Sequence, residues 1–128
     1  MKKKIILVIF AAIILLVFLG GIIIYKKIQN DLESLSQLQI EEIDLSLIDD
    51  GEYLGEYSAF PVSAKVKVTI FNHEITEILI LEHSNGQGGD AENITSSVIA
   101  SQSLQVEVIA GATYSSKVIL KAIENAFS

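Results

Sequence analysis

The sequence contains no cysteine, and this absence removes several kinds of chemistry. Without a thiol the protein forms no disulfide, no thiolate metal site and no iron–sulfur cluster, and it has no cysteine that could carry a lipid anchor. Any redox activity of this chain must therefore come from a bound cofactor.

Positive charge is scarce beyond the first 27 residues. Five of the nine lysines lie in residues 1–27, whereas all sixteen acidic residues come after residue 30. Residues 28–128 therefore carry four lysines and sixteen acids, a net charge of −12. We expect this part of the chain to repel nucleic acid and anionic lipid headgroups, so nucleic acid is excluded as a partner.

Several common site patterns are also missing. Glu82, His83 and Asp90 have metal-binding side chains, but their spacing matches no helical zinc pattern, and we predict no metal site. The glycine-rich residues 83–90 match neither the dinucleotide fingerprint nor a P-loop, whose lysine is missing. No nucleophile elbow surrounds either histidine or the Gly-Ala-Thr sequence at 111–113, so no hydrolase triad is predicted.

Residues 5–24 form an uninterrupted uncharged and almost wholly apolar run. As a helix rising about 1.5 Å per residue, such a run spans a hydrocarbon layer of about 30 Å. It is longer than the apolar core of a cleaved signal peptide, so residues 1–27 are interpreted as an uncleaved signal anchor. Lys2, Lys3 and Lys4 place the N-terminus in the cytoplasm and the rest of the chain outside it, while Lys26 and Lys27 weaken this contrast.

Beyond the anchor, the pattern predicts a stalk and linker at residues 28–49 and one folded domain at residues 50–128. A helical pattern continues to about residue 38. Alternation predicts strands at 53–57, 64–70 and 75–81, the last two forming a hairpin, and a further strand ending at 106–109. Helices are predicted from Asp90, as N-cap, through Gln102 and from Ser115 onward. The fold class is α+β, a small, mostly antiparallel sheet with two packed helices, preceded by one transmembrane helix.

The stretch from Ala110 to Ser116 joins the predicted last strand to the last helix. Gly111 permits a tight turn, and the N–H groups and dipole at the start of a helix favour an anion such as a phosphate. Lys117 is a further positive group close by. The alternative is an ordinary helix start at which Thr113 or Ser115 is the capping hydroxyl.

Five segments in order resemble the FMN-binding domain family. Residues 50–55 read Asp-Gly-Glu-Tyr-Leu-Gly, similar to the family's opening Asp-Gly-x-Tyr-x-Gly. The alternating strand at 66–70, the segment 75–78, the loop beginning at His83 and the terminal Gly-Ala-Thr-x-Ser with its helix follow. The resemblance covers nearly all of the domain.

The resemblance implies a flavin site and a maturation partner. In the family a flavin transferase links FMN through its phosphate to a hydroxyl residue, which falls at Ser115 after the matching Gly111, Ala112 and Thr113. Ser116 is the neighbouring hydroxyl and the competing carrier. The resemblance also implies that the 83–90 loop faces the flavin, with contributions from the residues His83, Asn85 and Gly86.

The resemblance further implies an electron carrier rather than a turnover enzyme, one that passes electrons from a membrane donor to an extracytoplasmic acceptor. The chain departs from the family pattern at Ala110, where a hydroxyl residue is usual, and at Glu107, where Asp is common. Ala110 favours an alternative, a non-redox binding or sensory module of the same fold without covalent flavin. A purely structural subunit is a third reading.

Overall fold

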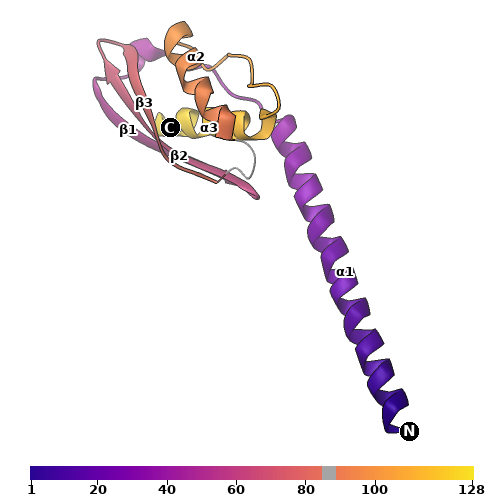
Figure 1. The fold of residues 1–128 in the computed structure, drawn as a ribbon. Coiled ribbons are helices and arrows are strands. Elements are labelled where there is room, and N and C mark those ends of the chain that lie inside the picture. The colour runs from indigo at the N-terminus through magenta and orange to yellow at the C-terminus, as the bar shows by residue number, and fades with distance from the viewer. Residues whose placement is uncertain (85–88) are drawn as a thin grey trace.

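The computed structural model describes residues 1–84 and 89–128. A long helix, α1 (Lys2–Ser36), projects from a small domain in which a three-stranded sheet is covered on one face by helices (Figure 1). The sheet is wholly antiparallel, in the order β1-β2-β3. The α+β class predicted from the sequence is therefore confirmed.

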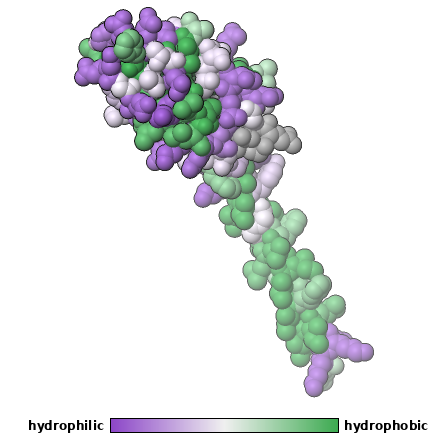
Figure 2. Space-filling model, turned by 60° about the vertical axis from the view of Figure 1, so that its left-hand side comes forward, coloured by the Kyte–Doolittle hydropathy of each residue, from purple (hydrophilic) through white to green (hydrophobic). Residues whose placement is uncertain are grey.

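Helix α1 is long and apolar enough, by length and composition, to cross a membrane. Its apolar side chains are exposed and form a continuous hydrophobic rod below a mostly hydrophilic domain (Figure 2). The predicted continuation of the helix beyond the apolar run is confirmed, because α1 ends only at Ser36. Leu35, in its last turn, is 1% exposed and belongs to the hydrophobic core of the domain.

The sheet consists of β1 (Gly51–Ala59), β2 (Val62–Phe71) and β3 (Glu74–Ser84). Alternate residues of β2 are buried, as the period of two predicts, and their side chains form one face of the core. The turn between β2 and β3 contains Asn72 and His73, both with positive φ, as in the two-residue turns that suit the twist of a hairpin. The predicted hairpin is confirmed.

Helix α3 (Thr113–Ala126) covers the buried face of β1 and β2. Its apolar stripe, predicted from the sequence, is buried: Ile119, Ala122 and Ile123 are fully inaccessible. The helix lies so close to the sheet that a Cβ on Gly55 would come within 2.0 Å of the Ala122 carbonyl oxygen. Gly55 therefore sets the distance between α3 and β1.

The preceding helix is shorter than predicted. Residues Gly89–Asn93 form the 3-10 helix η2, and α2 begins only at Ile94 and ends at Ser101. The prediction that Asp90 is the N-cap of this helix is wrong, because Asp90 lies inside η2. Gln102 follows α2 in a left-handed conformation, which ends the helix.

The strand predicted to end at residues 106–109 is absent from the described part of the chain. The Gln102 side chain occupies the β3 edge instead, where it accepts a hydrogen bond from Ile75 N (2.6 Å) and donates one to Ile75 O (2.9 Å). The segment that follows is bonded to the linker: Leu104 N donates to Glu42, and the Gln105 side chain donates to Ile40 O at 2.6 Å. Val106 and Ile109 of this segment pack against the hydrophobic core without extending the sheet.

The linker between α1 and β1 is packed against the domain. It contains a short 3-10 helix, η1 (Leu45–Leu47), and its apolar side chains Leu38, Ile40, Ile43, Leu45 and Ile48 are half-buried against the core. Glu42 accepts hydrogen bonds from the Ser103 hydroxyl and from Leu104 N. The linker and the segment before α3 therefore hold each other in place, and the division of the chain at residue 50 stays a prediction.

Candidate flavin-binding site

The site begins with a tight turn just before α3. Gly111 has φ of 78°, a left-handed conformation that glycine adopts without strain, and Ala112 N donates to Ile109 O at 2.9 Å to close the turn. Helix α3 then starts at Thr113 with Ala112 as its N-cap. The tight turn predicted at Gly111 is confirmed, but the predicted start of the helix at Ser115 is two residues late.

The first turn of α3 keeps its backbone donors available. No side chain in the described residues caps this helix, so the alternative in which Thr113 or Ser115 is the capping hydroxyl is not observed. The N–H groups at the start of a helix have no partner within the helix itself, and here they belong to Thr113, Tyr114 and Ser115. Together with the helix dipole they make a site that suits the phosphate of a flavin nucleotide.

The two neighbouring serines have different surroundings. Ser116 is completely buried, and its hydroxyl accepts a hydrogen bond from Ile109 N (3.1 Å) and donates one to Ala112 O (2.7 Å). Its hydroxyl thus ties both sides of the Gly111 turn to the helix. The Ser115 hydroxyl, in contrast, makes no hydrogen bond to residues 1–84 or 89–128.

Ser115 itself is 3% exposed. It is the third residue of α3 and belongs to the turn whose backbone donors suit a phosphate. A phosphoester on this oxygen is much larger than a hydroxyl, so its formation requires the segments that cover Ser115 to move aside. The Ser115 hydroxyl therefore makes no hydrogen bond among the described residues, and a transferase has little access to it.

Lys117 is directed elsewhere than the sequence suggested. Its Nζ donates a hydrogen bond to Leu38 O at 3.1 Å, so the ammonium group joins α3 to the linker. The positive end available to a phosphate is thus supplied by the backbone of the first helical turn. Lys117 instead adds to the contacts that hold the linker against the domain.

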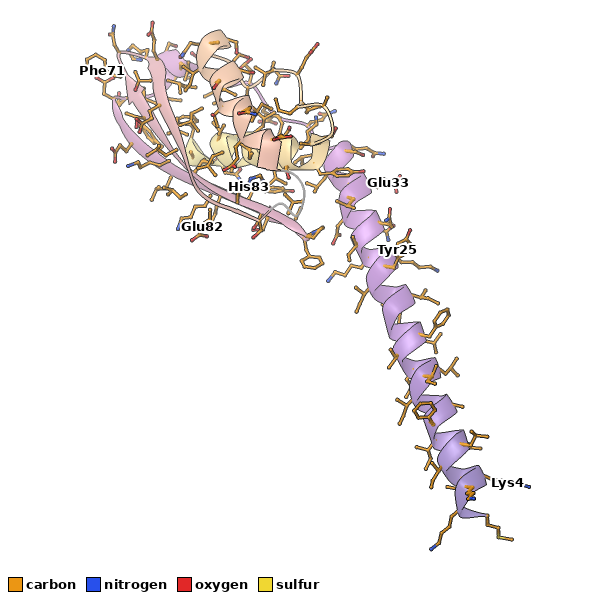
Figure 3. All side chains as sticks on the ribbon, in the orientation of Figure 1. Lys4, Tyr25, Glu33, Phe71, Glu82 and His83 are labelled. Atoms are coloured by element: carbon orange, nitrogen blue, oxygen red, sulfur yellow. The ribbon has the colours of Figure 1, made fainter. Side chains whose placement is uncertain are left out.

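His83 lies near the end of β3, on the face covered by the helices. Its register partner is the buried Ala64, whereas the preceding Glu82 is paired with Lys65 on the opposite face (Figure 3). Burial lowers the pKa of the His83 imidazole below its usual value, while the nearby Glu92 carboxylate opposes this effect. His83 is therefore held mostly neutral at pH 7. The other two predicted ring contacts, Asn85 and Gly86, lie outside the described residues.

Sequence reasoning missed two groups that support the site. It treated Ser116 only as a competing carrier, although a hydroxyl one turn after a glycine turn is well placed to bond its backbone. It gave no role to Glu42, whose carboxylate binds the segment leading to the turn. The Ser103 hydroxyl that donates to this carboxylate lowers the pKa of Glu42, and the N–H groups of Ile43 and Leu104 act in the same direction. No local pattern could have indicated this contact, because the partners are about sixty positions apart.

Comparison with known proteins agrees with the geometry of the α3 N-terminus. The sequence model of the FMN-binding domain matches residues 62–128, which include β2, β3, the Gly111 turn and α3. No curated protein and no solved structure matches the chain. The match covers more than half of the chain and ends on the helix that presents the phosphate-binding donors, and we conclude that this protein belongs to the FMN-binding domain family.

Proposed function

We propose that this protein is a membrane-anchored electron carrier whose single FMN is joined through its phosphate to Ser115. The observation that carries the proposal is the conjunction, in one chain, of an FMN-binding domain ending in the Gly111 turn and α3 with an N-terminal helix able to span a membrane. Lys2, Lys3 and Lys4 favour a cytoplasmic N-terminus, and the domain then lies outside the cytoplasm.

The surroundings of the two serines support Ser115 over Ser116 as the carrier. Using the Ser116 hydroxyl would break two hydrogen bonds that close the Gly111 turn. Using the Ser115 hydroxyl breaks none among the described residues and keeps the phosphate beside the N–H groups of the first turn. No side chain in the described residues accepts hydrogen bonds from these backbone donors. In the proposed complex the phosphate oxygens accept them.

Attachment replaces the O–H bond of Ser115 by an O–P bond. The proton leaves to a base or to solvent. The phosphorus comes from a flavin dinucleotide, whose diphosphate P–O bond breaks as the O–P bond to Ser115 forms. The other nucleotide leaves as a monophosphate. A flavin transferase that uses such a donor is the maturation partner. Outside the cytoplasm a covalent bond also prevents loss of the cofactor, and the anchor keeps it near membrane partners at high effective concentration.

FMN, when bound, supplies one- and two-electron transfer, which no side chain of this cysteine-free protein provides. The chain's own residues hold and position it. The first turn of α3 fixes the phosphate, and His83, whose pKa is lowered by burial, lies on the helix-covered face of the sheet. A membrane electron donor and an extracytoplasmic acceptor complete the proposed pathway.

The decisive experiment is co-expression with a flavin transferase, followed by denaturing gel electrophoresis under ultraviolet light. We expect a fluorescent band for the wild type and for Ser115→Thr, which keeps a hydroxyl, and no band for Ser115→Ala. Ser116→Ala is the matched control and should keep the band, although its turn is weakened. A dark wild-type band would refute covalent attachment, and a band lost only in Ser116→Ala would move the carrier by one residue.

The second candidate is a non-redox binding module of the same fold, which Ala110 favours because a hydroxyl residue is usual there in the family. Titration of the unmodified protein with free FMN distinguishes the two when the gel is dark. Quenching of flavin fluorescence with saturation would leave a non-covalent flavoprotein. No quenching would leave a module that binds another ligand.

A further inference from the structure

The two turns of the sheet differ sharply in polarity. The β2–β3 turn contains Asn72, His73 and Glu74, and Asn72 N donates to the Asp50 carboxylate at 2.7 Å. The β1–β2 turn contains Phe60 and Pro61, and no charged residue occurs between positions 57 and 64. The β1–β2 turn is thus an uncharged turn of the sheet within a region of net charge −12.

A phenylalanine is exposed at each end of β2. Phe60 is 64% exposed at one end and Phe71 is 65% exposed at the other. The eleven positions from Phe60 to Phe71 correspond to at most about 36 Å of extended backbone, at about 3.3 Å per residue. Because the two side chains are almost equally exposed, Phe71 is a matched control for Phe60 at a different distance from α1.

The Phe60 turn lies beside the upper part of α1. A groove of about 400 Å³ is lined by Asp31, Ser34 and Leu35 of α1 and by Tyr57, Ser58 and Phe60 of the β1 end. The β1–β2 end of the sheet points along α1 toward its N-terminal half, whereas the labelled Phe71 lies at the far end of the domain (Figures 1 and 3). The β1–β2 turn is therefore at the end of the sheet that is directed toward the apolar N-terminal half of α1.

The helix fixes the height of this turn above the apolar run. Asp31 is seven residues beyond Ile24, the last residue of the run, which corresponds to about 10 Å along a helix. The headgroup layer adds roughly 5–8 Å to each side of the hydrocarbon core. The Phe60 turn, which shares a groove with Asp31, thus reaches the headgroup layer with a modest tilt of α1, of the size common in membrane helices.

We propose that the Phe60–Pro61 turn is a second membrane contact, with the Phe60 ring inserted among the lipid headgroups beside α1. The partner is the lipid surface itself: the turn is apolar, carries no charge and lies next to the proposed anchor, on which this inference rests. Attachment at α1 and at Phe60 fixes the orientation of the domain against the bilayer. It also holds the N-terminus of α3 at a constant height above the membrane.

The absence of tryptophan from the sequence provides the probe. Phe60→Trp and Phe71→Trp each create a full-length protein with a single tryptophan, which is reconstituted into phosphatidylcholine vesicles with plain or brominated acyl chains. Zwitterionic lipid avoids repulsion of the acidic domain. Melting temperatures equal to that of the wild type establish that both variants fold.

We expect the Phe60→Trp variant to lose about half of its emission in brominated vesicles and to emit at shorter wavelength, as an aromatic ring in the interface does. The Phe71→Trp variant should be unaffected by bromine. Equal quenching of the two variants, or none in Phe60→Trp, overturns the proposal. A blue shift in Phe60→Trp without bromine quenching also overturns it, because the ring then packs against protein.

Flotation of the same samples separates this inference from the proposed anchor. Protein that floats with the vesicles but shows no quenching at position 60 refutes only the second contact. Protein that fails to float refutes the anchor and this contact together. The gel test of flavin attachment to Ser115 is independent of both results.

Discussion

Gly55 offers the sharpest test of how the sheet positions α3, the helix at the proposed flavin site. A Cβ at this position would lie 2.0 Å from Ala122 O, 2.6 Å from Ala126 N and 2.8 Å from Ala126 Cβ. Two of these atoms belong to the α3 backbone, so no rotation of a side chain relieves the contact. Gly55→Ala can be accommodated only if α3 moves away from β1.

The magnitude follows from the cost of overpacking. Inserting a methyl group into a packed core typically costs about 1–3 kcal/mol, and contacts this short with backbone place Gly55→Ala near about 3 kcal/mol. For a domain of this size about 1 kcal/mol lowers the melting temperature by roughly 4–8 °C. We therefore expect a decrease of roughly 12–24 °C. The displacement of α3 should also reduce flavin attachment, because the first turn of that helix is part of the site.

The assay is thermal denaturation of the full chain in detergent micelles, followed by the near-ultraviolet dichroism of the tyrosines. That signal reports tertiary packing of the domain, such as the contact between the rings of Tyr53 and Phe127 at 5.3 Å, and is insensitive to the helicity of α1. Gly89→Ala is the matched control, since nothing lies within 4 Å of its Cβ position and it should melt like the wild type.

Gly111→Ala separates sterics from backbone strain. Its Cβ position is also open, but its φ of 78° is unfavourable for alanine, and we expect a loss of about 1–2 kcal/mol. The reasoning is refuted if Gly55→Ala melts within error of Gly89→Ala. It is equally refuted if Gly111→Ala is the more damaging of the two.

Two further predictions concern the support of the site. Ser116→Ala should lower the free energy of unfolding by about 1–3 kcal/mol, because the Ile109 N–H loses its acceptor. Amide hydrogen exchange at Ile109 should become faster in this variant and stay unchanged in Ser115→Ala. Equal exchange in both variants would contradict the assigned role of Ser116. The folded-state pKa of Glu42 is lowered chiefly by the Ser103 hydroxyl, so its contribution to stability is complete above the unfolded pKa and is lost as the pH falls through the lower folded value. Melting temperatures measured from neutral to acidic pH should therefore fall less steeply in Glu42→Gln and Ser103→Ala than in the wild type, and parallel curves would argue against this contact.

Local sequence patterns were sufficient for the parts of the fold whose residues are close in the chain. The apolar run and the helical spacing after it predicted α1, and the alternation around residues 64–81 predicted the β2–β3 hairpin with its turn. The stripe of Ile119, Ala122 and Ile123 predicted the buried face of α3. Each of these signals is a periodicity of side chains along one element, and the side chains report directly which face meets the core.

The strand predicted at 106–109 failed for a tertiary reason. Its residues have the composition of a strand, but before they are reached the Gln102 side chain takes both backbone groups of Ile75 at the β3 edge. The same segment finds its partners on the linker instead. Composition predicted that apolar side chains of this segment meet the core, as Val106 and Ile109 do, but it could not show which backbone the segment would meet.

At the proposed flavin-binding site the sequence by itself determined the glycine turn, the helix that follows it and a choice between two adjacent serines. Only the tertiary structure decided how those serines differ, because the hydroxyl of Ser116 is bonded across the turn and that of Ser115 makes no bond among the described residues. It also decided that Lys117 and Glu42 bind the linker to the site, through partners 79 and 61–62 positions away. Periodicity is a local property of the chain, whereas a hydrogen bond between distant segments exists only after the core has brought them together.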